Sequence, residues 1–401
     1  MPSLPRRVLF AILGVAVSTL TALVLAEWVA TLTLRAPAER KAAEQGTPWD
    51  RRDRLDLVVE GRRADPNWFP AVPANTYLER IVTVEGRRVI PLGGVAGVKV
   101  VGCNENGYYS SWRTDEFGFA NPAGALASRG PHLFFIGDSF TQGDCLKSDE
   151  SIVGRVRAAR VETVNLGNGG NGPLLELASI REYVDRSSVS YALWMYYEGN
   201  DLDDLRRDRA NPILARYLDP AFAQGLRPIQ DKVNGAVRDM ANTRYEERVQ
   251  GRPIVFPSLR QLVWEARNKA GAPRADEAQA HVGHGDDDTL ELFLTILRNA
   301  RDEIAEKGGQ LALVYLPEYY RYGGPRLSGG ASRRNELLQG ARALGIPVID
   351  IDEVFRQHAD PVQFFPFRLK GHYNSAGTKI VADEILRFLS TAPIQSMASE
   401  R

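Results

Sequence analysis

The sequence predicts an α/β fold built on a parallel sheet, and three observations support this. Several short apolar runs, such as residues 133–136, have the length and composition of strands buried on both faces. Amphipathic helical patterns begin after residue 173 and after residue 375. With 401 residues and 44% hydrophobic content, the chain can bury a complete α/β core.

The first expected strand, residues 133–136, leads into the most informative turn of the chain. Gly137 turns the chain, and Ser139 follows at the carboxyl end of the strand, the edge where open α/β sheets bind ligands. A serine in this position is suited to be a nucleophile. Gly-Asp-Ser is also an ordinary turn sequence, so this turn alone does not identify a site.

A second expected strand, residues 162–166, ends in a glycine cluster that would let backbone N–H groups approach a ligand closely. Gly167, Gly169 and Gly172 also satisfy the Gly-x-Gly-x-x-Gly spacing of dinucleotide-binding loops. Such a loop normally follows the first strand and expects an acid about twenty residues later, whereas Glu198 lies about thirty residues on. We therefore expect no nucleotide and no other cofactor.

Two more polar segments occupy comparable positions. A third strand begins near residue 191, and Asn200 lies just after its end. His372 lies just before a helix for which Asn374 or Ser375 would be the N-cap. Taken singly, Asn200 could simply cap the next helix, and His372 could be structural.

The remaining expected strands are residues 311–316 and 348–351, with helices at 289–307 and 332–344 that each end at a glycine. A long, charged and largely helical insertion is expected at about residues 202–288. Insertions at this edge of a sheet often form lids or substrate walls, although structural padding is an equal alternative.

The polar segments resemble, in their order, the four motif blocks of the SGNH (GDSL-type) hydrolase superfamily, which carry serine, glycine, asparagine and histidine. The resemblance covers about residues 131–390 and implies a three-layer α/β/α, flavodoxin-like parallel sheet. It implies that Ser139 is the nucleophile and His372 its general base. It also implies an oxyanion hole formed by the backbone N–H groups of Ser139 and Gly170 and the side-chain amide of Asn200.

The acid that should orient the histidine is missing from its usual place. The family usually has an aspartate three residues before the histidine, and that position is Leu369 here. Asp350 and Asp352 end an expected strand at the correct edge of the sheet, and Asp201 is another candidate, as is Glu198. Alternatively, serine and histidine act as a dyad, or the enzyme is weak or inactive.

The resemblance implies a serine esterase that forms an acyl-serine intermediate, with deacetylation of a cell-envelope glycan as the leading example. The substrate would be an acylated small molecule or a glycan. An O-acyltransferase acting on an extracytoplasmic polysaccharide would use the same serine and is an alternative. A non-catalytic binding module that retains the fold is a second alternative.

Charge and metal-ligand patterns exclude other classes of function. The chain has 50 basic and 50 acidic residues, so its net charge gives no reason to expect nucleic acid as a partner. His281 and His284 lack a matching second pair of ligands, so we expect no metal site.

The N-terminus carries a membrane signal. Residues 8–26 are a run of about nineteen residues without a charge, long enough to cross a bilayer, and Trp28 follows as an interfacial residue. Residues 24–26 resemble a cleavage site, so a cleaved signal peptide is the alternative. We expect a single-pass anchor in a bacterial inner membrane, with a periplasmic catalytic domain. Envelope polysaccharide machinery would be a partner.

The chain has two cysteines, Cys103 and Cys145. With an export signal present, one disulfide between them is plausible, and it would pin the segment before the domain against the loop after Ser139. Two buried free thiols are the alternative.

These observations divide the chain into five parts. They are a cytoplasmic tip and transmembrane anchor (1–34), a linker (35–50), a β-rich appended region (51–130), the hydrolase-like domain with its insertion (131–390) and a tail (391–401).

Overall fold

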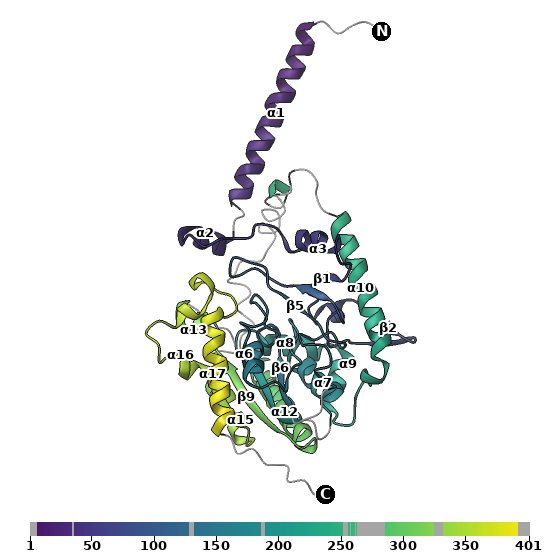
Figure 1. The fold of residues 1–401 in the computed structure, drawn as a ribbon, viewed down its shortest axis with the longest axis vertical. Helices are drawn as coiled ribbons and strands as arrows, with labels where there is room; N and C mark the ends of the chain where they lie inside the picture. The colour runs from purple at the N-terminus through teal and green to yellow at the C-terminus, as the bar shows by residue number, and fades with distance from the viewer. Residues whose placement is uncertain are drawn as a thin grey trace.

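The computed structural model of the protein describes residues 6–33, 36–127, 132–185, 189–251, 256, 258–260, 262, 285–324 and 332–391. These residues form an α/β domain, a second region packed on it, and a long N-terminal helix that extends away from both (Figure 1).

A five-stranded parallel sheet forms the centre of the α/β domain. Its strands are β6 (His132–Gly137), β7 (Thr163–Asn165), β8 (Val189–Tyr197), β9 (Gln310–Leu316) and β10 (Val348–Asp350). They lie in the order β10-β9-β8-β6-β7, and every neighbouring pair is parallel. Counted along the chain this is the order 2-1-3-4-5 of flavodoxin-like folds, which confirms the expected fold class.

Both faces of this sheet are buried, which explains why its strands are nearly continuous apolar runs. Successive residues of each strand belong to different cores. In β6, Phe134 lies in the core on one face and Phe135 in the core on the other, and in β8 Trp194 and Met195 are divided in the same way. Because side chains alternate across a strand, each apolar run supplies both cores at once.

Helices cover the two faces. Those of the α/β domain are α5 (Ser139–Gln142), α6 (Ile152–Ala159), α7 (Pro173–Tyr183), α8 (Asp201–Arg209), α9 (Pro212–Ala215), α12 (Gly285–Glu306), α13 (Tyr320–Gly323), α15 (Arg334–Ala343), α16 (Ile351–Phe355) and α17 (Ser375–Thr391). Helix α17 packs against α6, and α7 packs against α12 and α8. The sheet therefore lies between two helical layers, as the three-layer expectation requires.

The appended region contains short strands and short helices. A small sheet has the order β1-β4-β5 and a hairpin pairs β2 with β3. Its elements are α3 (Arg54–Arg62), β1 (Trp68–Pro70), α4 (Thr76–Glu79), β2 (Val82–Val84), β3 (Arg87–Val89), β4 (Lys99–Val101) and β5 (Ser111–Arg113). The segment expected to be a linker, residues 35–50, contains a further short helix, α2 (Pro37–Glu44). Phe117 and Phe119 both make edge contacts with Tyr183 of α7, so this region shares the core of the α/β domain.

The described part of the insertion holds the appended region in place. Helix α10 (Gln230–Gln250) packs against β2 and β1, along one side of the molecule in Figure 1. The Gln224 side chain binds both the N–H and the carbonyl of Ile90, at 2.8 and 3.2 Å. This part of the insertion therefore acts as a structural support. Residues 263–284 lie outside the described part of the chain, and so do His281 and His284.

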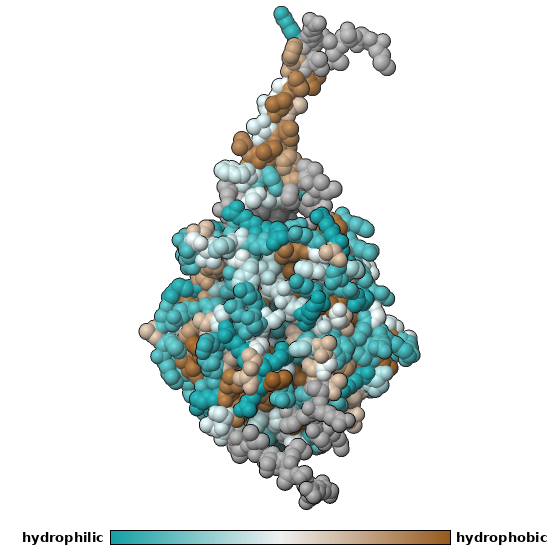
Figure 2. All heavy atoms as spheres, in the orientation of Figure 1, coloured by the Kyte–Doolittle hydropathy of each residue, from teal (hydrophilic) through white to brown (hydrophobic). Residues whose placement is uncertain are grey.

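Helix α1 (Arg6–Thr33) is apolar and exposed. Within it, Ile12–Thr31 is a 20-residue stretch with the length and hydropathy of a membrane span, and it is exposed along most of its length, with Ala30 buried near its C-terminal end. Figure 2 shows the contrast between this apolar helix and the largely hydrophilic surface of the domain. These properties suit a single-pass anchor, and a signal sequence would share them.

Candidate active site

The candidate nucleophile lies where the central strand β6 turns into helix α5. Asp138 is the N-cap of α5, and its carboxylate accepts a hydrogen bond from Phe140 N at 2.9 Å. A Cβ atom on Gly137 would lie 2.2 Å from Thr141 Oγ1, so this tight turn requires glycine. Ser139 is the first residue of the helix, at the carboxyl edge of the sheet.

The imidazole of His372 contacts this serine directly. Its Nε2 atom lies 2.9 Å from Ser139 Oγ, which is a hydrogen-bond distance. The segment that carries His372 leads into α17, and Asn374 fixes the start of that helix. Its Oδ1 atom accepts hydrogen bonds from Ala376 N and Gly377 N. The N-cap function thus falls to Asn374, one of the two residues expected for it.

A carboxylate that the sequence did not reveal occupies the other side of the imidazole. Oε1 of Glu105 lies 3.1 Å from His372 Nδ1, and Oε2 accepts the backbone N–H of His372 at 2.7 Å. Glu105 belongs to the loop between β4 and β5, in the appended region. A Cβ atom on Gly371 would lie 2.6 Å from Oε2, so glycine at 371 lets the carboxylate reach the histidine. Ser139, His372 and Glu105 are therefore arranged in line.

This geometry corrects the expectation that Asp350 or Asp352 supplies the acid. Both follow β10, which is separated from β6 by two strands, or about 14 Å at the usual strand spacing. Asp350 pairs with Arg334, and Asp352 binds Arg356 at 3.0 Å and accepts the hydroxyl of Tyr322 at 2.6 Å.

The other two candidate acids are engaged elsewhere as well. The Asp201 carboxylate accepts Tyr197 N at 2.9 Å, and Glu198 pairs with Arg321 at 2.5 Å. The dyad alternative is unnecessary here, because Glu105 occupies the position of the orienting acid.

The charges around His372 favour its protonated form. Burial lowers the pKa of the imidazole, but the carboxylate of Glu105 outweighs it, helped by Asp144 and Asp138, and raises the pKa to about 9. Burial raises the pKa of Glu105 in turn, but the neighbouring imidazolium outweighs that effect and holds it below its usual value. The site is therefore prepared to stabilise a positive charge on the histidine.

Two backbone N–H groups next to the serine are free to bind a substrate oxygen. Among the residues that the structure describes, no hydrogen bond engages the N–H of Ser139 or of Gly170. Gly170 adopts a left-handed conformation with φ of 76°, which favours glycine. A Cβ atom on Gly169 would lie 3.8 Å from Ser139 Cβ, so the glycine loop passes beside the nucleophile.

Asn200 is the N-cap of α8, in the turn that follows β8. Its Nδ2 atom donates to Asp204 at 2.9 Å and, over a longer 3.4 Å, to Asp138 beside the nucleophile. The structure thus brings Ser139, Gly170 and Asn200 into one neighbourhood. Arg207 of α8 binds the Gly170 carbonyl at 2.9 Å. It fixes the glycine loop to helix α8.

Buried acids lie behind this oxyanion region. Burial raises the pKa of Asp204 to about 7 and that of Asp208 to about 6, and it also raises the pKa of Glu176. Arg207 pairs with Asp204 at 2.6 Å and with Asp208 at 3.2 Å. This network supports the loop from within the protein.

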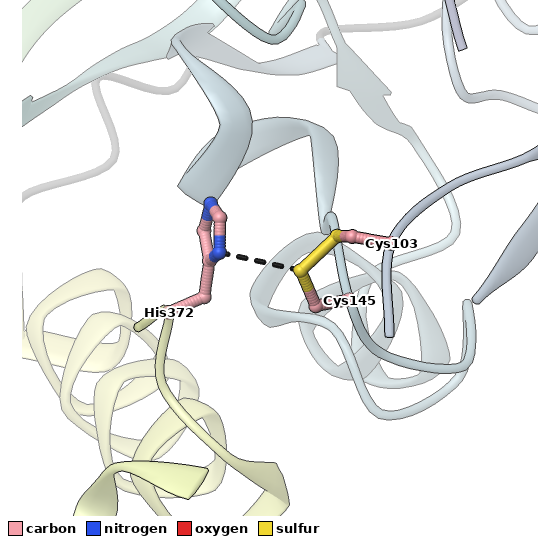
Figure 3. Close-up of side chains that lie close together, drawn as sticks. All are labelled: Cys103, Cys145 and His372. Atoms are coloured by element: carbon pink, nitrogen blue, oxygen red, sulfur yellow. Dashed lines mark hydrogen bonds between the residues drawn. A yellow bond between two sulfur atoms is a disulfide. The ribbon is translucent and has the colours of Figure 1, made fainter. Parts of the chain in front are cut away.

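A disulfide closes the site on the side of Glu105. Cys103 and Cys145 are bonded, with their Cα atoms 4.7 Å apart, and Cys145 Sγ lies 3.3 Å from His372 Nδ1 (Figure 3). Asn106 adds a second link, because its Nδ2 atom donates to the carbonyl of Cys145 at 3.0 Å. These links join the loop that carries Glu105 to the loop that follows the nucleophile.

The chain was also compared with known proteins. Residues 275–401, which include His372, match the family model described as "SGNH hydrolase-like domain, acetyltransferase AlgX". The match is confined to this segment, which is about a third of the chain. No curated protein matches the chain.

Solved structures similar to this chain include three proteins of low identity. A lipolytic protein of the G-D-S-L family from Veillonella parvula is 13% identical, with 66% of this chain and 100% of that chain covered and a TM-score of 0.35. A lipase/acylhydrolase from Enterococcus faecalis is 14% identical, with coverage of 65% and 95% and a TM-score of 0.34. An acetylxylan esterase from Geobacillus stearothermophilus is 16% identical, with coverage of 67% and 98% and a TM-score of 0.34. Such scores carry no assignment of their own.

The match to this family supports an ester-acting enzyme, with hydrolysis and transfer both open. One signal in the sequence could have pointed to Glu105. It lies two residues after Cys103, so the expected disulfide already placed it near the loop after Ser139.

Proposed function

We propose that this protein is a serine esterase that removes an acyl group from an ester through an acyl-serine intermediate. The observation that carries the proposal is the alignment of three side chains. Ser139 Oγ lies 2.9 Å from His372 Nε2, and Glu105 Oε1 lies 3.1 Å from His372 Nδ1. This is the arrangement that turns a serine hydroxyl into a nucleophile.

In the first step, Ser139 Oγ attacks the ester carbonyl and His372 Nε2 takes the hydroxyl proton. Glu105 accepts the Nδ1 proton, which keeps Nε2 free to act as the base; this tautomer is assigned from the hydrogen bonds. The imidazolium that forms is stabilised by the adjacent carboxylate. The bond between carbonyl carbon and leaving alkoxide then breaks, and His372 returns the proton to the alkoxide.

The negative charge that develops on the carbonyl oxygen would be bound by the N–H groups of Ser139 and Gly170. Asn200 would provide a third donor. Its Nδ2 atom carries two hydrogens, and the 3.4 Å contact with Asp138 is long enough for a substrate oxygen to displace. Each such donor contributes roughly a hundredfold to a thousandfold in rate.

The second half of the reaction differs only in the group that attacks the acyl-serine. Water gives an esterase, and a sugar hydroxyl gives an O-acyltransferase. The second candidate is supported by the printed description of the matched family, which names an acetyltransferase. We propose acetyl as the acyl group and a cell-envelope glycan as the substrate.

The location we propose follows from α1. An exposed apolar stretch of 20 residues at the N-terminus would tether the enzyme to the bacterial inner membrane and leave the domain in the periplasm. There it would meet envelope polysaccharides and the machinery that handles them. The disulfide suits an oxidising compartment.

A binding module that has kept the fold and lost its acid is disfavoured by Glu105. A module without chemistry would gain nothing from a carboxylate that accepts two hydrogen bonds from His372.

Turnover of an aryl acetate by the full chain in detergent tests the proposal. We expect Ser139→Ala and His372→Gln to reduce turnover to background, while Ser148→Ala retains it, because the Ser148 hydroxyl donates to the backbone carbonyl of Ser111, at 3.3 Å, at the surface. Equal rates for wild type and Ser139→Ala would contradict an enzyme at this site. Addition of acetylated and deacetylated envelope glycans, with acetyl followed by mass, separates hydrolysis from transfer.

A further inference from the structure

Arg207 of α8 contacts both sides of the proposed oxyanion hole. Its Nη2 atom donates to the Gly170 carbonyl at 2.9 Å, and its Nη1 atom donates to Asp204 Oδ1 at 2.6 Å. The other oxygen of that carboxylate, Asp204 Oδ2, accepts a hydrogen bond from the Asn200 side-chain amide at 2.9 Å. One guanidinium group is therefore linked to two of the proposed donors, to Gly170 directly and to Asn200 through Asp204.

We infer that Arg207 is a positioning residue that holds the donors of Gly170 and Asn200 in the arrangement that a single oxyanion requires. The inference rests on the proposed function. A planar guanidinium suits this role, because its two terminal nitrogens are rigidly spaced and can donate to two acceptors at once. Its contacts engage the Gly170 carbonyl and, through Asp204, one amide hydrogen of Asn200. The second amide hydrogen makes the long 3.4 Å contact with Asp138 and can turn to the substrate oxygen.

The glycine loop depends on contacts from outside for its conformation. Gly170 has a positive φ of 76° and no side chain, so its own backbone does not restrict it to one conformation. The peptide before it is fixed from the appended region, because Ala74 N donates to the Gly169 carbonyl at 2.8 Å. Arg207 fixes the peptide after it. With both peptides held, the N–H of Gly170 has a defined direction.

The charge of Arg207 also supports the contact with Asn200. Burial raises the pKa of the Asp204 carboxyl to about 7, even though the neighbouring guanidinium lowers it. Without that guanidinium the carboxyl would take up a proton more readily, and a neutral acid is a weaker acceptor for the Asn200 amide than a carboxylate. Arg207 therefore favours the ionised form of Asp204, the form that orients the amide.

Steady-state and pre-steady-state kinetics with an aryl acetate test the inference on the full chain in detergent. Arg207→Gln should lower kcat by about a hundredfold and leave KM nearly unchanged, because a misplaced donor acts on the transition state more than on the bound ester. Acylation and deacylation should slow by similar factors, since an oxyanion forms in each step. Arg207→Lys should lose less, because one ammonium group can still reach one of the two acceptors.

Arg206→Gln is the matched control. Arg206 pairs with Asp203, three residues earlier on the same helix, just as Arg207 pairs with Asp204. The control therefore removes an equivalent ion pair from α8 at a position that does not contact the glycine loop. It should retain the kinetics of the wild type.

A double-mutant cycle separates positioning from a general loss of structure. In Asn200→Ala the branch through Asp204 no longer ends in a donor, so Arg207→Gln should cost a smaller factor in kcat there than in the wild type. Equal factors in the two backgrounds would contradict the link between Arg207 and Asn200.

Hydrogen exchange followed by mass spectrometry gives a readout that does not depend on catalysis. Residues 167–172 should exchange faster in Arg207→Gln than in the wild type or Arg206→Gln, with little change in thermal unfolding. If Arg207→Gln does not fold, Arg207→Lys serves in the same comparisons. Wild-type turnover by Ser139→Ala would refute the proposed function, whereas exchange would still show whether Arg207 holds the loop. Unchanged exchange in the Arg207 variant, or wild-type kcat in an enzyme that requires Ser139, overturns the inference.

Discussion

Glu105 and His372 lie 267 residues apart in the chain and make two contacts, one to the ring nitrogen Nδ1 and one to the backbone N–H. In the proposed triad the appended region would supply the acid, while the α/β domain would supply the serine and the histidine. The packing between the two regions is therefore part of the site itself.

Glu105→Gln should reduce kcat strongly and leave the fold intact. The amide can donate a hydrogen bond to Nδ1, which favours the wrong imidazole tautomer, and the corresponding loss in a serine triad is about ten-thousandfold. Steady-state kinetics with an aryl acetate measures it. Glu116→Gln is the matched control, because the Glu116 carboxylate contacts Gly124 N at the surface of the same region. Equal losses in both variants would contradict the role given to Glu105.

The pH profile should reveal the charged environment of His372. Catalysis needs the neutral imidazole, and its pKa is raised to about 9, so kcat/KM should increase with pH, with its inflection near pH 9. Replacing Glu105 by glutamine removes the main stabilising charge, so the inflection should move towards the ordinary value of 6.5. A profile that does not move in the variant would show that Glu105 does not control this titration.

The raised pKa of His372 also makes the free energy of unfolding depend on pH within a defined range. The folded protein binds the His372 proton more tightly than the unfolded chain does, so this contribution is complete below about pH 6.5. It is lost as the pH rises through about 9. Denaturant unfolding of wild type and Glu105→Gln at pH 6 and pH 10 measures it, and the difference between the two proteins should be larger at pH 6.

Asn200→Ala should lower kcat by roughly a hundredfold to a thousandfold with little change in KM, because the amide would act on the transition-state oxygen. Asn200 also binds Asp204, so a structural loss must be separated from a catalytic one. Thermal unfolding and binding of an unreactive substrate analogue provide that separation. An unchanged kcat would remove Asn200 from the proposed oxyanion hole.

Gly371→Ala should reduce activity, although the substitution opens no cavity and removes no hydrogen-bonding side chain. Its Cβ atom would lie 2.6 Å from Glu105 Oε2, so the carboxylate must move away from His372. Gly235→Ala on α10 is the control, because no atom lies within 4 Å of its Cβ atom. Activity should fall in the first variant and persist in the second, which should gain about 1 kcal/mol or less in helix stability. Full activity in Gly371→Ala would contradict the close contact.

The parts of the site that the sequence predicted are those carried by local patterns. Ser139 follows a buried strand, Gly170 lies in a glycine-rich loop, and His372 precedes an amphipathic helix. The position and neighbours of each could be inferred from a few adjacent residues. The parallel sheet could be predicted for the same reason, because its strands are apolar runs buried on both faces.

The acid could not be inferred in that way. Glu105 lies in a loop after a three-residue strand, and its contact with His372 exists only once two regions pack together. Leu369 stands where the family usually has an aspartate. The candidate acids that the sequence indicates therefore lie near the carboxyl ends of the other strands. The supporting role of α10 also depends on tertiary contacts, because nothing in its charged sequence specifies β2 as its partner.

The most direct test of the central claim is to look for the acyl group on the serine. Full-length enzyme is mixed with an aryl acetate, quenched in acid and digested, and the peptides are analysed by mass spectrometry. We predict acetyl on Ser139 in the wild type and no acetylated peptide in Ser139→Ala. Turnover with acetyl on a different residue, or turnover by Ser139→Ala at the wild-type rate, would contradict the account.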